Sequence, residues 1–273
     1  TGGNSEVVFV VDSELWENSI ESLVQKTFGK TIEGINQTEF LFRVAQVNHS
    51  EFKSILKTHT NVVIVSEGVT PSSQKNKWAS GQFVAQLNWE NNSRQFLKEL
   101  KELRAIFVLK EVKSIRASLA KQSQKNIEKK LTSNFGVECI IPKKYQIIKN
   151  DNTLFWANYD PPKSDEIKNI FVFSFVLKTT NLQTEVLNKT DSIFAKYLTG
   201  LKEGSFVRIE PEYPPYYFEN TYRGLWRLEH GFMGGAFLIK TYFINNKIVV
   251  NVGLVFDPQG RKRKHIKEFE AIL

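Results

Sequence analysis

The sequence predicts an α+β fold of mostly antiparallel sheets with helices packed on one face, in two βα-type halves. The main observation is the stretch from Arg223 to Pro258, which reads as three consecutive strands at 223–230, 236–244 and 247–257. Asn245 and Asn246 tolerate the left-handed conformation that a two-residue hairpin needs, and Gly231 to Gly235 provide the earlier connection. Hairpins that are segregated from helices indicate α+β rather than a doubly wound parallel sheet.

Length and composition predict a packed globular protein. The 273 residues suffice for one large domain or two ordinary ones, and 41% are hydrophobic. The formal net charge of +8 permits attraction to anionic partners, but lysines are scattered along the whole chain and favour a solvated basic surface. The single cysteine, Cys139, excludes an intramolecular disulfide and a cysteine zinc site.

Elements of the N-terminal half begin after a short polar lead, Thr1 to Ser5. A helix is expected at 14–28, where apolar residues recur at helical spacing, and Gly29 ends it. Asn48 or Ser50 can open a second helix. Residues 67–81 are polar and read as a loop. Apolar runs rich in β-branched or aromatic residues predict strands at 7–12, 40–47, 61–66 and 82–89.

A long helical region follows Asn91–Ser93 and carries two apolar stripes. The pattern fades in the polar stretch 121–126 and returns at Ile127, so two helices are expected rather than one long rod. Gly136 closes the second helix. The border between the halves is therefore placed within 120–136, which gives an N-terminal half of residues 1–130 and a C-terminal half of 131–273.

The C-terminal half contains further strands and two helices besides the three-stranded unit. Prolines extend the segment 205–222, which is dense in tyrosine. A helix is expected at 182–200, and a last helix follows the PQG turn after Asp257. The additional strands are expected at 137–141, 153–159 and 169–177.

No motif in the sequence indicates a particular catalytic reaction. His49, His59, His230 and His265 do not form an HExxH pair, and the GxSxG pattern of a nucleophile elbow is absent. A triad built from distant residues stays open. We therefore predict no catalytic residue, no metal site and no cofactor. These observations weigh against enzyme activity but leave the question open.

The best binding candidate is the tyrosine-rich segment 210–222. Tyrosine offers a large amphipathic surface at low entropic cost, as recognition surfaces require. The alternative is that these rings cover the open edge of the sheet. Arg223 can bind an anion, or it can stack on an aromatic ring or pair with Glu229. The predicted ligand-binding or partner-binding residues are Tyr213, Tyr216, Tyr217, Arg223 and Trp226.

The strongest run of charge opens the last helix. Cations at a helix start oppose the helix dipole, so their placement suggests an acidic contact, although most short basic runs are simply solvated. No aromatic residue that would stack on bases is interleaved, so nucleic acid is an unlikely partner. The candidate anion-binding residues are Arg261, Lys262, Arg263 and Lys264.

Three segments resemble an uncharacterised family of predicted Bacteroidetes lipoproteins, DUF4837. They are GGNSEVVFVVD near the start, RGLWRLEHGFMGGAF in the centre and VGLVFDPQGRKRKHIKEFEAIL at the end. Members carry a lipobox cysteine just ahead of the glycine-rich lead, so this chain, which starts without Met, is expected to be a trimmed or mature fragment. The resemblance implies a periplasm-facing envelope location with a membrane contact only through an N-terminal lipid anchor. It brings no catalytic residues.

Three functions follow from these observations, in descending order. The first is a non-catalytic envelope protein that binds an unknown envelope protein or glycan through the tyrosine-rich segment and the adjoining sheet. The second is an enzyme of unrecognised type that acts on envelope glycans or peptides. The third is a binder of anionic surfaces or nucleic acid that uses the basic run.

Overall fold

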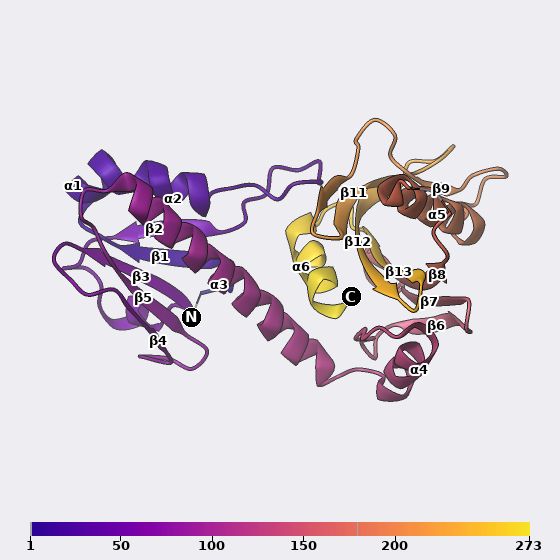
Figure 1. The fold of residues 1–273 in the computed structure, drawn as a ribbon, viewed down its shortest axis with the longest axis horizontal. Coiled ribbons are helices and arrows are strands. Elements are labelled where there is room, and N and C mark those ends of the chain that lie inside the picture. Colours follow the sequence, from indigo (N-terminus) through magenta and orange to yellow (C-terminus); the bar gives the residue numbers. More distant parts are fainter. Residues whose placement is uncertain (1, 179) are drawn as a thin grey trace. The chain divides into compact units, whose positions relative to one another are not determined.

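The chain folds into two compact units (Figure 1). The structure is a computed structural model and describes residues 2–178 and 180–273. Thr1, the first residue of the predicted polar lead, lies outside the described residues. The N-terminal unit comprises Thr1–Ile32 and Glu39–Glu111, and the C-terminal unit comprises Glu33–Thr38 and Val112–Leu273. Each unit mixes helices with its own sheet, which confirms the α+β class. The units divide inside a helix, ahead of the expected border at 120–136.

The sheet of the N-terminal unit is mainly parallel, so the expectation of antiparallel strands is wrong here. In the described residues its strand order is β2-β1-β3-β5-β4, and only β4 runs antiparallel to its neighbour. The cause is visible in VVFVVD and NVVIVS, because strands buried on both faces read as continuous apolar runs. The strands are β1 (Glu6–Val10), β2 (Arg43–Val47), β3 (Asn61–Ser66), β4 (Ser72–Lys75) and β5 (Phe83–Asn88).

Helices cover one face of this sheet and a short turn covers the other. A continuous helical run is formed by α1 (Ser13–Leu15), the π-turn η1 (Trp16–Ile20) and α2 (Glu21–Thr27), and it packs with α3 (Ser93–Ala120) on one face. On the opposite face lies the 3₁₀ turn η2 (Ser54–Thr58). Its Leu56, together with Phe52 just before the turn, packs with Trp78. The expected helix after Asn48 is thus only this turn, and the expected loop at 67–81 contains β4.

The sheet of the C-terminal unit is antiparallel, as expected. Its order in the described residues is β10-β11-β12-β13-β8-β7-β6, with β9 also paired to β11. The predicted three-stranded unit is confirmed, and Asn245 and Asn246 take φ of 50° and 61° in its two-residue turn. The strands are β6 (Gln146–Asn150), β7 (Leu154–Tyr159), β8 (Ile167–Phe175), β9 (Val207–Ile209), β10 (Tyr216–Phe218), β11 (Thr221–Leu228), β12 (Gly234–Ile244) and β13 (Lys247–Phe256).

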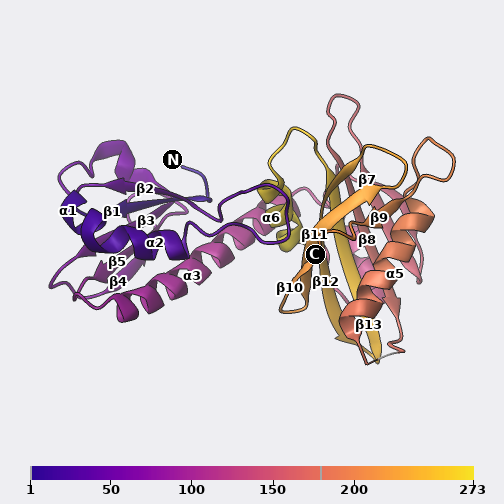
Figure 2. The same cartoon turned by 90° about the horizontal axis from the view of Figure 1, so that it is seen from above.

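Helices lie on both faces of this sheet, so the expectation of one covered face is wrong. Figure 2 shows the sheet between α5 (Leu182–Tyr197) and α6 (Lys262–Ile272). Along β13, Val250 and Val252 join the core beneath α5, whereas Val249 and Val255 join the core beneath α6. A strand that is apolar at both its odd and even positions needs cover on both faces.

The predicted break in the long helical region is confirmed. Helix α3 ends at Ala120 and α4 (Lys125–Phe135) begins after the polar residues, with Gly136 ending α4 at φ 74°. The strand expected at 137–141 is wrong. That segment is buried except for Glu138, and residues of two helices accept hydrogen bonds from its backbone. Ile140 N–H donates to the carbonyl of Ile272 in α6, and Ile141 N–H donates to the Glu128 side chain of α4.

Candidate functional site

The tyrosine-rich segment lies at the edge of the C-terminal sheet in the described structure. Strand β10 pairs with β11 through Tyr216–Arg223, Tyr217–Tyr222 and Phe218–Thr221, and all three β10 side chains are exposed. Tyr213, just before the prolines, is 57% exposed. We call Tyr213, Tyr216, Tyr217 and Phe218 the aromatic edge. Large exposed rings gathered on a sheet edge are typical of an interaction surface.

The rings of the aromatic edge are distributed over both faces of the strand. Because side chains alternate along a strand, Tyr216 and Phe218 share one face and Tyr217 has the other. The Tyr217 ring lies 4.8 Å from that of Tyr222, which is buried in the core beneath α5. Tyr217 is therefore held in place by a core residue, while its hydroxyl donates to Asn220 Oδ1 at 3.3 Å.

A hollow of about 310 Å³ adjoins the aromatic edge. It is lined by Gly224 and Leu225 of β11 and by Tyr213, Pro214 and Tyr216. The segment Glu33–Ile35 also lines it. Gly34 has φ +84°, and a Cβ there would lie 2.5 Å from the Arg223 carbonyl oxygen, so this close approach requires glycine.

Arg223 and Trp226 do not belong to the aromatic edge. Arg223 Nη2 lies 2.9 Å from Glu270 Oε1 of α6, in a half-buried ion pair. Trp226 is buried, and its indole N–H donates to the carbonyl of Val255 at 3.1 Å. The structure thus brings Tyr213, Tyr216 and Tyr217 together at the surface and places the other two residues in internal contacts.

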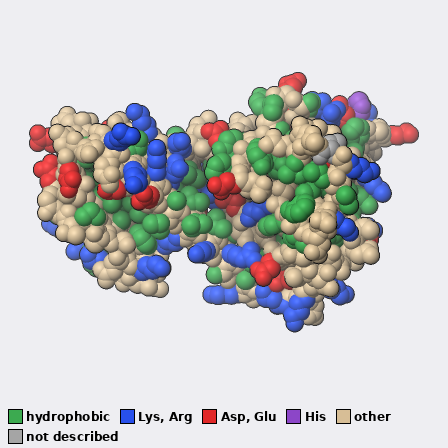
Figure 3. Space-filling view, in the orientation of Figure 1, with side chains coloured by type: hydrophobic (Ala, Val, Ile, Leu, Met, Phe, Trp, Pro, Cys, Tyr) green, Lys and Arg blue, Asp and Glu red, His purple; other side chains and the backbone are tan. Residues whose placement is uncertain are grey.

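The four basic residues that open α6 have different environments. Arg261 is exposed, whereas Lys262 is buried and its ammonium donates to the carbonyls of Asp257 and Gly260. Arg263 is half-buried. Lys264 Nζ lies 3.1 Å from Asp257 Oδ2 and 3.9 Å from Glu166 Oε2. Lys262 and Lys264 therefore have partners within the fold. Figure 3 shows Lys and Arg spread over both units on the face in view.

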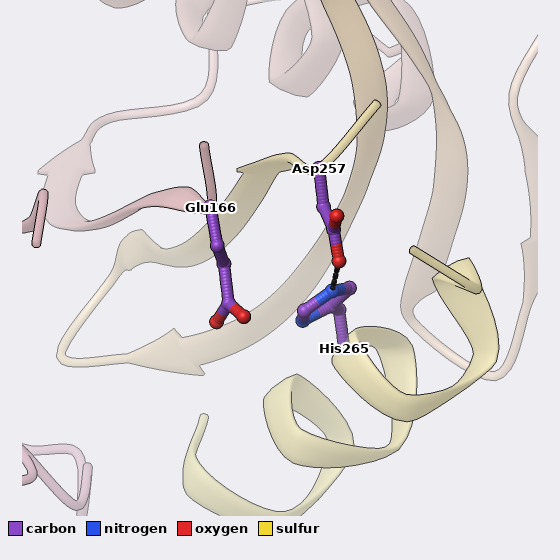
Figure 4. Close-up of side chains that lie close together, drawn as sticks. All are labelled: Glu166, Asp257 and His265. Carbon is purple, nitrogen blue, oxygen red and sulfur yellow. Dashed lines mark hydrogen bonds and ion pairs between the residues drawn. The ribbon is translucent and has the colours of Figure 1, made fainter. Parts of the chain in front are cut away.

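A buried ionic cluster, which the sequence did not reveal, lies beneath these lysines. We define it as Glu166, Lys168, Asp257, His265 and Glu268. Lys168, only 2% exposed, bridges Glu166 Oε1 at 2.7 Å and Glu268 Oε2 at 2.5 Å. His265 Nε2 lies 2.7 Å from Asp257 Oδ2 (Figure 4). The sequence signal was weak, because these residues come from the start of β8, the end of β13 and α6.

At most positions of the cluster, charge pairing shifts the pKa more than burial does. Burial raises the pKa of Asp257, but hydrogen bonds from His265 and Lys264 hold it lower, at about 2. Burial lowers the pKa of Lys168, but Glu268 and Glu166 raise it above its usual value. His265 differs, because burial and the Lys168 ammonium lower its pKa. Asp257 and Lys168 are therefore ionised beside a neutral imidazole at neutral pH.

The cluster contains a set of possible metal ligands. One ligand atom each from Glu166, Asp257 and His265 lie within 4.8 Å of one another, and two carboxylates with an imidazole suit a transition metal. However, the Lys264 and Lys168 ammonium groups already neutralise both carboxylates, and the Nε2 of His265 faces Asp257. A cation would have to displace Lys264, so the residues present fit a salt-bridge cluster better than a metal centre.

Comparisons with known proteins give family membership but no function. The family described as "Domain of unknown function (DUF4837)" matches residues 124–273, and that described as "Domain of unknown function (DUF8532)" matches residues 1–120. No curated protein matches. The chain shows 10% identity to the human StarD13 (DLC2) lipid transfer and protein localization domain, over 54% of this chain and 91% of that one, with a TM-score of 0.21. That score supports no argument.

The helices give no sign of a membrane-spanning segment, since none in the described residues is both long and apolar enough to cross a bilayer. The C-terminal sheet, the aromatic edge and the ionic cluster all fall within the first of the two matched regions. That region covers more than half of the sequence. The chain therefore belongs to the DUF4837 family, whose function is unknown.

Proposed function

We propose that this protein is a cell-envelope lipoprotein whose C-terminal unit binds an extended segment of a partner protein at the aromatic edge. The observation that carries the proposal is the exposed edge strand β10 with aromatic side chains on both of its faces, beside the hollow over Gly224. An edge strand offers unpaired backbone groups to an incoming chain, and alternate pockets and rings then select its side chains.

An extended polypeptide suits this edge better than a flat surface would. Tyr216 lines the hollow on one face, and Tyr217 is supported from behind by Tyr222 on the other. A partner strand next to β10 would therefore meet rings on both faces of the lengthened sheet. Because β10 has only three residues, pairing is limited and selective, which also protects the isolated protein from edge-to-edge aggregation.

The test uses the full-length protein with a benzophenone amino acid in place of Phe218, crosslinked by light in the native envelope. We expect a crosslink to an extended segment of one partner, and a synthetic peptide of that segment should bind the wild-type protein. Tyr216→Ala with Tyr217→Ala should weaken peptide binding at least tenfold, because buried tyrosine rings dominate such interfaces.

The matched control is Phe243→Ala, which removes another exposed ring, 72% exposed, from β12 of the same sheet. It should leave peptide binding unchanged. Equal binding by the double tyrosine variant, with an unchanged thermal unfolding midpoint, would contradict the assignment of the site to the aromatic edge.

The envelope location rests on the family resemblance and has its own test. The intact mass of the full-length gene product, purified from membranes of its native host, should show a diacylated or triacylated cysteine ahead of residue 1. An unmodified product would refute the lipid anchor but leave the peptide-binding test standing, so the two parts of the proposal fail separately.

A further inference from the structure

The N-terminal unit has an open hollow where parallel-sheet proteins bind ligands. In the order β2-β1-β3-β5, the chain leaves β1 toward β2 on one side and continues through β3 on the other. The crevice outside the carboxyl ends of strands at such a switch point is the usual ligand site of open α/β sheets. A hollow of about 580 Å³ lies there, and three of its lining residues are Asp12, His49 and Ser66.

These three residues end three neighbouring strands and form a hydrogen-bonded chain. Asp12 follows β1, His49 follows β2 and Ser66 is the last residue of β3. Asp12 Oδ1 lies 3.2 Å from Nδ1 of His49 and also accepts the His49 main-chain N–H at 3.2 Å. His49 Nε2 lies 3.1 Å from Ser66 Oγ. The imidazole therefore joins a carboxylate to a hydroxyl.

This order of atoms is the one that nucleophilic hydrolysis requires. When Nδ1–H donates to Asp12, Nε2 carries the lone pair that accepts the Ser66 hydroxyl proton. The hydrogen bonds from the His49 side chain and main chain lower the pKa of Asp12, so its carboxylate stays ionised and can stabilise an imidazolium. Asp12 is 67% exposed and Ser66 is half-buried, so solvent and substrate can reach the chain.

We propose that Ser66, His49 and Asp12 form an acyl-transfer site in which Ser66 is the nucleophile, His49 the general base and Asp12 a positioning residue. Ser66 Oγ attacks the carbonyl carbon of an ester while His49 Nε2 takes the hydroxyl proton. The carbon–oxygen bond to the alcohol then breaks, and His49 returns the proton to the leaving oxygen. Water attacks the acyl-Ser66 by the same route, which releases the acid and restores the Ser66 hydroxyl.

The lining of the hollow defines the class of substrate. Glu14 and Glu67 join Asp12 around it, so their negative charge disfavours an anionic acyl group and favours a neutral or cationic ester. Asn18 and Ser19 also line the hollow, and neither side chain has a hydrogen-bond partner within the described part of the chain. Their amide and hydroxyl are available as donors to a carbonyl oxygen.

A fluorophosphonate tests this proposal without knowledge of the natural substrate. Attack by Ser66 Oγ breaks the phosphorus–fluorine bond, releases fluoride and leaves a stable phosphonyl-serine. We expect one adduct per chain in the intact mass, mapped to Ser66, and none in Ser66→Ala. His49→Ala should slow labelling at least 100-fold, since a positioned base contributes roughly 10²–10⁴. Hydrolysis of p-nitrophenyl acetate should fall in parallel.

Two controls separate catalysis from a purely structural link between strand ends. Ser72→Ala on β4 and His230→Ala in the C-terminal unit remove other exposed residues of the same types and should label at the wild-type rate. Asp12→Asn should move the acid limb of the labelling pH profile to lower pH, because the imidazolium loses its carboxylate. A structural role alone would not move that limb.

The decisive measurements are the labelling of the wild-type protein and of His49→Ala. A folded wild-type chain that stays unlabelled at Ser66, or a His49→Ala variant that labels as fast as wild type, overturns the proposal. Neither result bears on the aromatic edge, which belongs to the other unit.

Discussion

At the scale of single residues, the buried His265 makes stability depend on pH. It is 1% exposed, and among the described residues no hydrogen-bond partner reaches its Nδ1. This fits a neutral ring that donates from Nε2 to Asp257. Burial and the Lys168 ammonium lower its pKa in the folded state, while in the unfolded chain histidine titrates near ~6.5.

The expected result is a loss of stability as pH falls from 7 to 5. In this window the unfolded state binds a proton that folded His265 does not, so the free energy of unfolding falls with pH by up to ~1.4 kcal/mol per unit. His265→Gln should flatten the slope of stability against pH, measured by urea unfolding at each pH. His230→Gln, at an exposed position, should keep the wild-type slope. Equal slopes in His265→Gln and wild type would contradict the buried neutral ring.

The Asp257 carboxylate affects stability over a different pH range. Because the pKa of Asp257 is lowered to about 2, its contribution to stability is present above the unfolded value of ~3.9 and is lost as pH falls toward 2. The slope between pH 7 and 5 therefore does not report on Asp257. Titrations over the two ranges distinguish the histidine from its partner.

At the scale of elements, the docking of α6 on β13 depends on a glycine. A Cβ on Gly253 would lie 2.4 Å from Cδ1 of the fully buried Phe269 ring. Gly253→Ala should therefore cost about 1–3 kcal/mol of unfolding free energy, as overpacking does. Gly3→Ala, whose added Cβ would meet only ordinary contacts at 3.5 Å or more, is the control and should change little.

A double variant shows whether the clash itself is the cause. Phe269→Leu makes room, so combining it with Gly253→Ala should cost less than the sum of the two single changes. Additive costs in chemical denaturation would mean that the glycine matters for backbone reasons and not for the packing of α6.

Local signals predicted the elements whose structure is set locally. The Asn245–Asn246 hairpin and the stop at Gly136 depend on residues that tolerate positive φ, and both formed where expected. The apolar segment 137–141 did not form a strand, because its apolar residues needed only burial, and residues of α6 and α4 accept hydrogen bonds from its backbone. Composition alone does not distinguish these two outcomes.

The candidate sites were only partly predictable for a related reason. Tyrosines between prolines stand out in a sequence, so Tyr213, Tyr216 and Tyr217 could be singled out as exposed candidates, but Trp226 proved to be a core residue. Asp12, His49 and Ser66 lie far apart in sequence and match no local motif. The available signal was a polar residue after each apolar run, which points to one sheet edge only when the strands are known to be parallel.

At the scale of the whole molecule, each unit has a hydrophobic core of its own. Phe9, Val63 and Phe107 belong to the core of the N-terminal unit, and Phe237 and Val250 to that of the C-terminal unit. Helix α3 contributes Phe107 to the first and Leu119 to the other. Two cores within one chain predict that local stability can change in one unit without an equal change in the other.

A matched pair of substitutions tests this independence. Val63→Ala in β3 and Val250→Ala in β13 each remove two methyl groups from a fully buried position and should each cost about 2 kcal/mol. Hydrogen exchange should show lost protection in β1, β3 and β5 for the first variant, and in β8, β12 and β13 for the second. Lost protection in both units from either change would indicate a single cooperative structure. With independent units, Val250→Ala leaves labelling of Ser66 intact and Val63→Ala leaves peptide binding intact, so the two proposed activities can be assigned to separate parts of the chain.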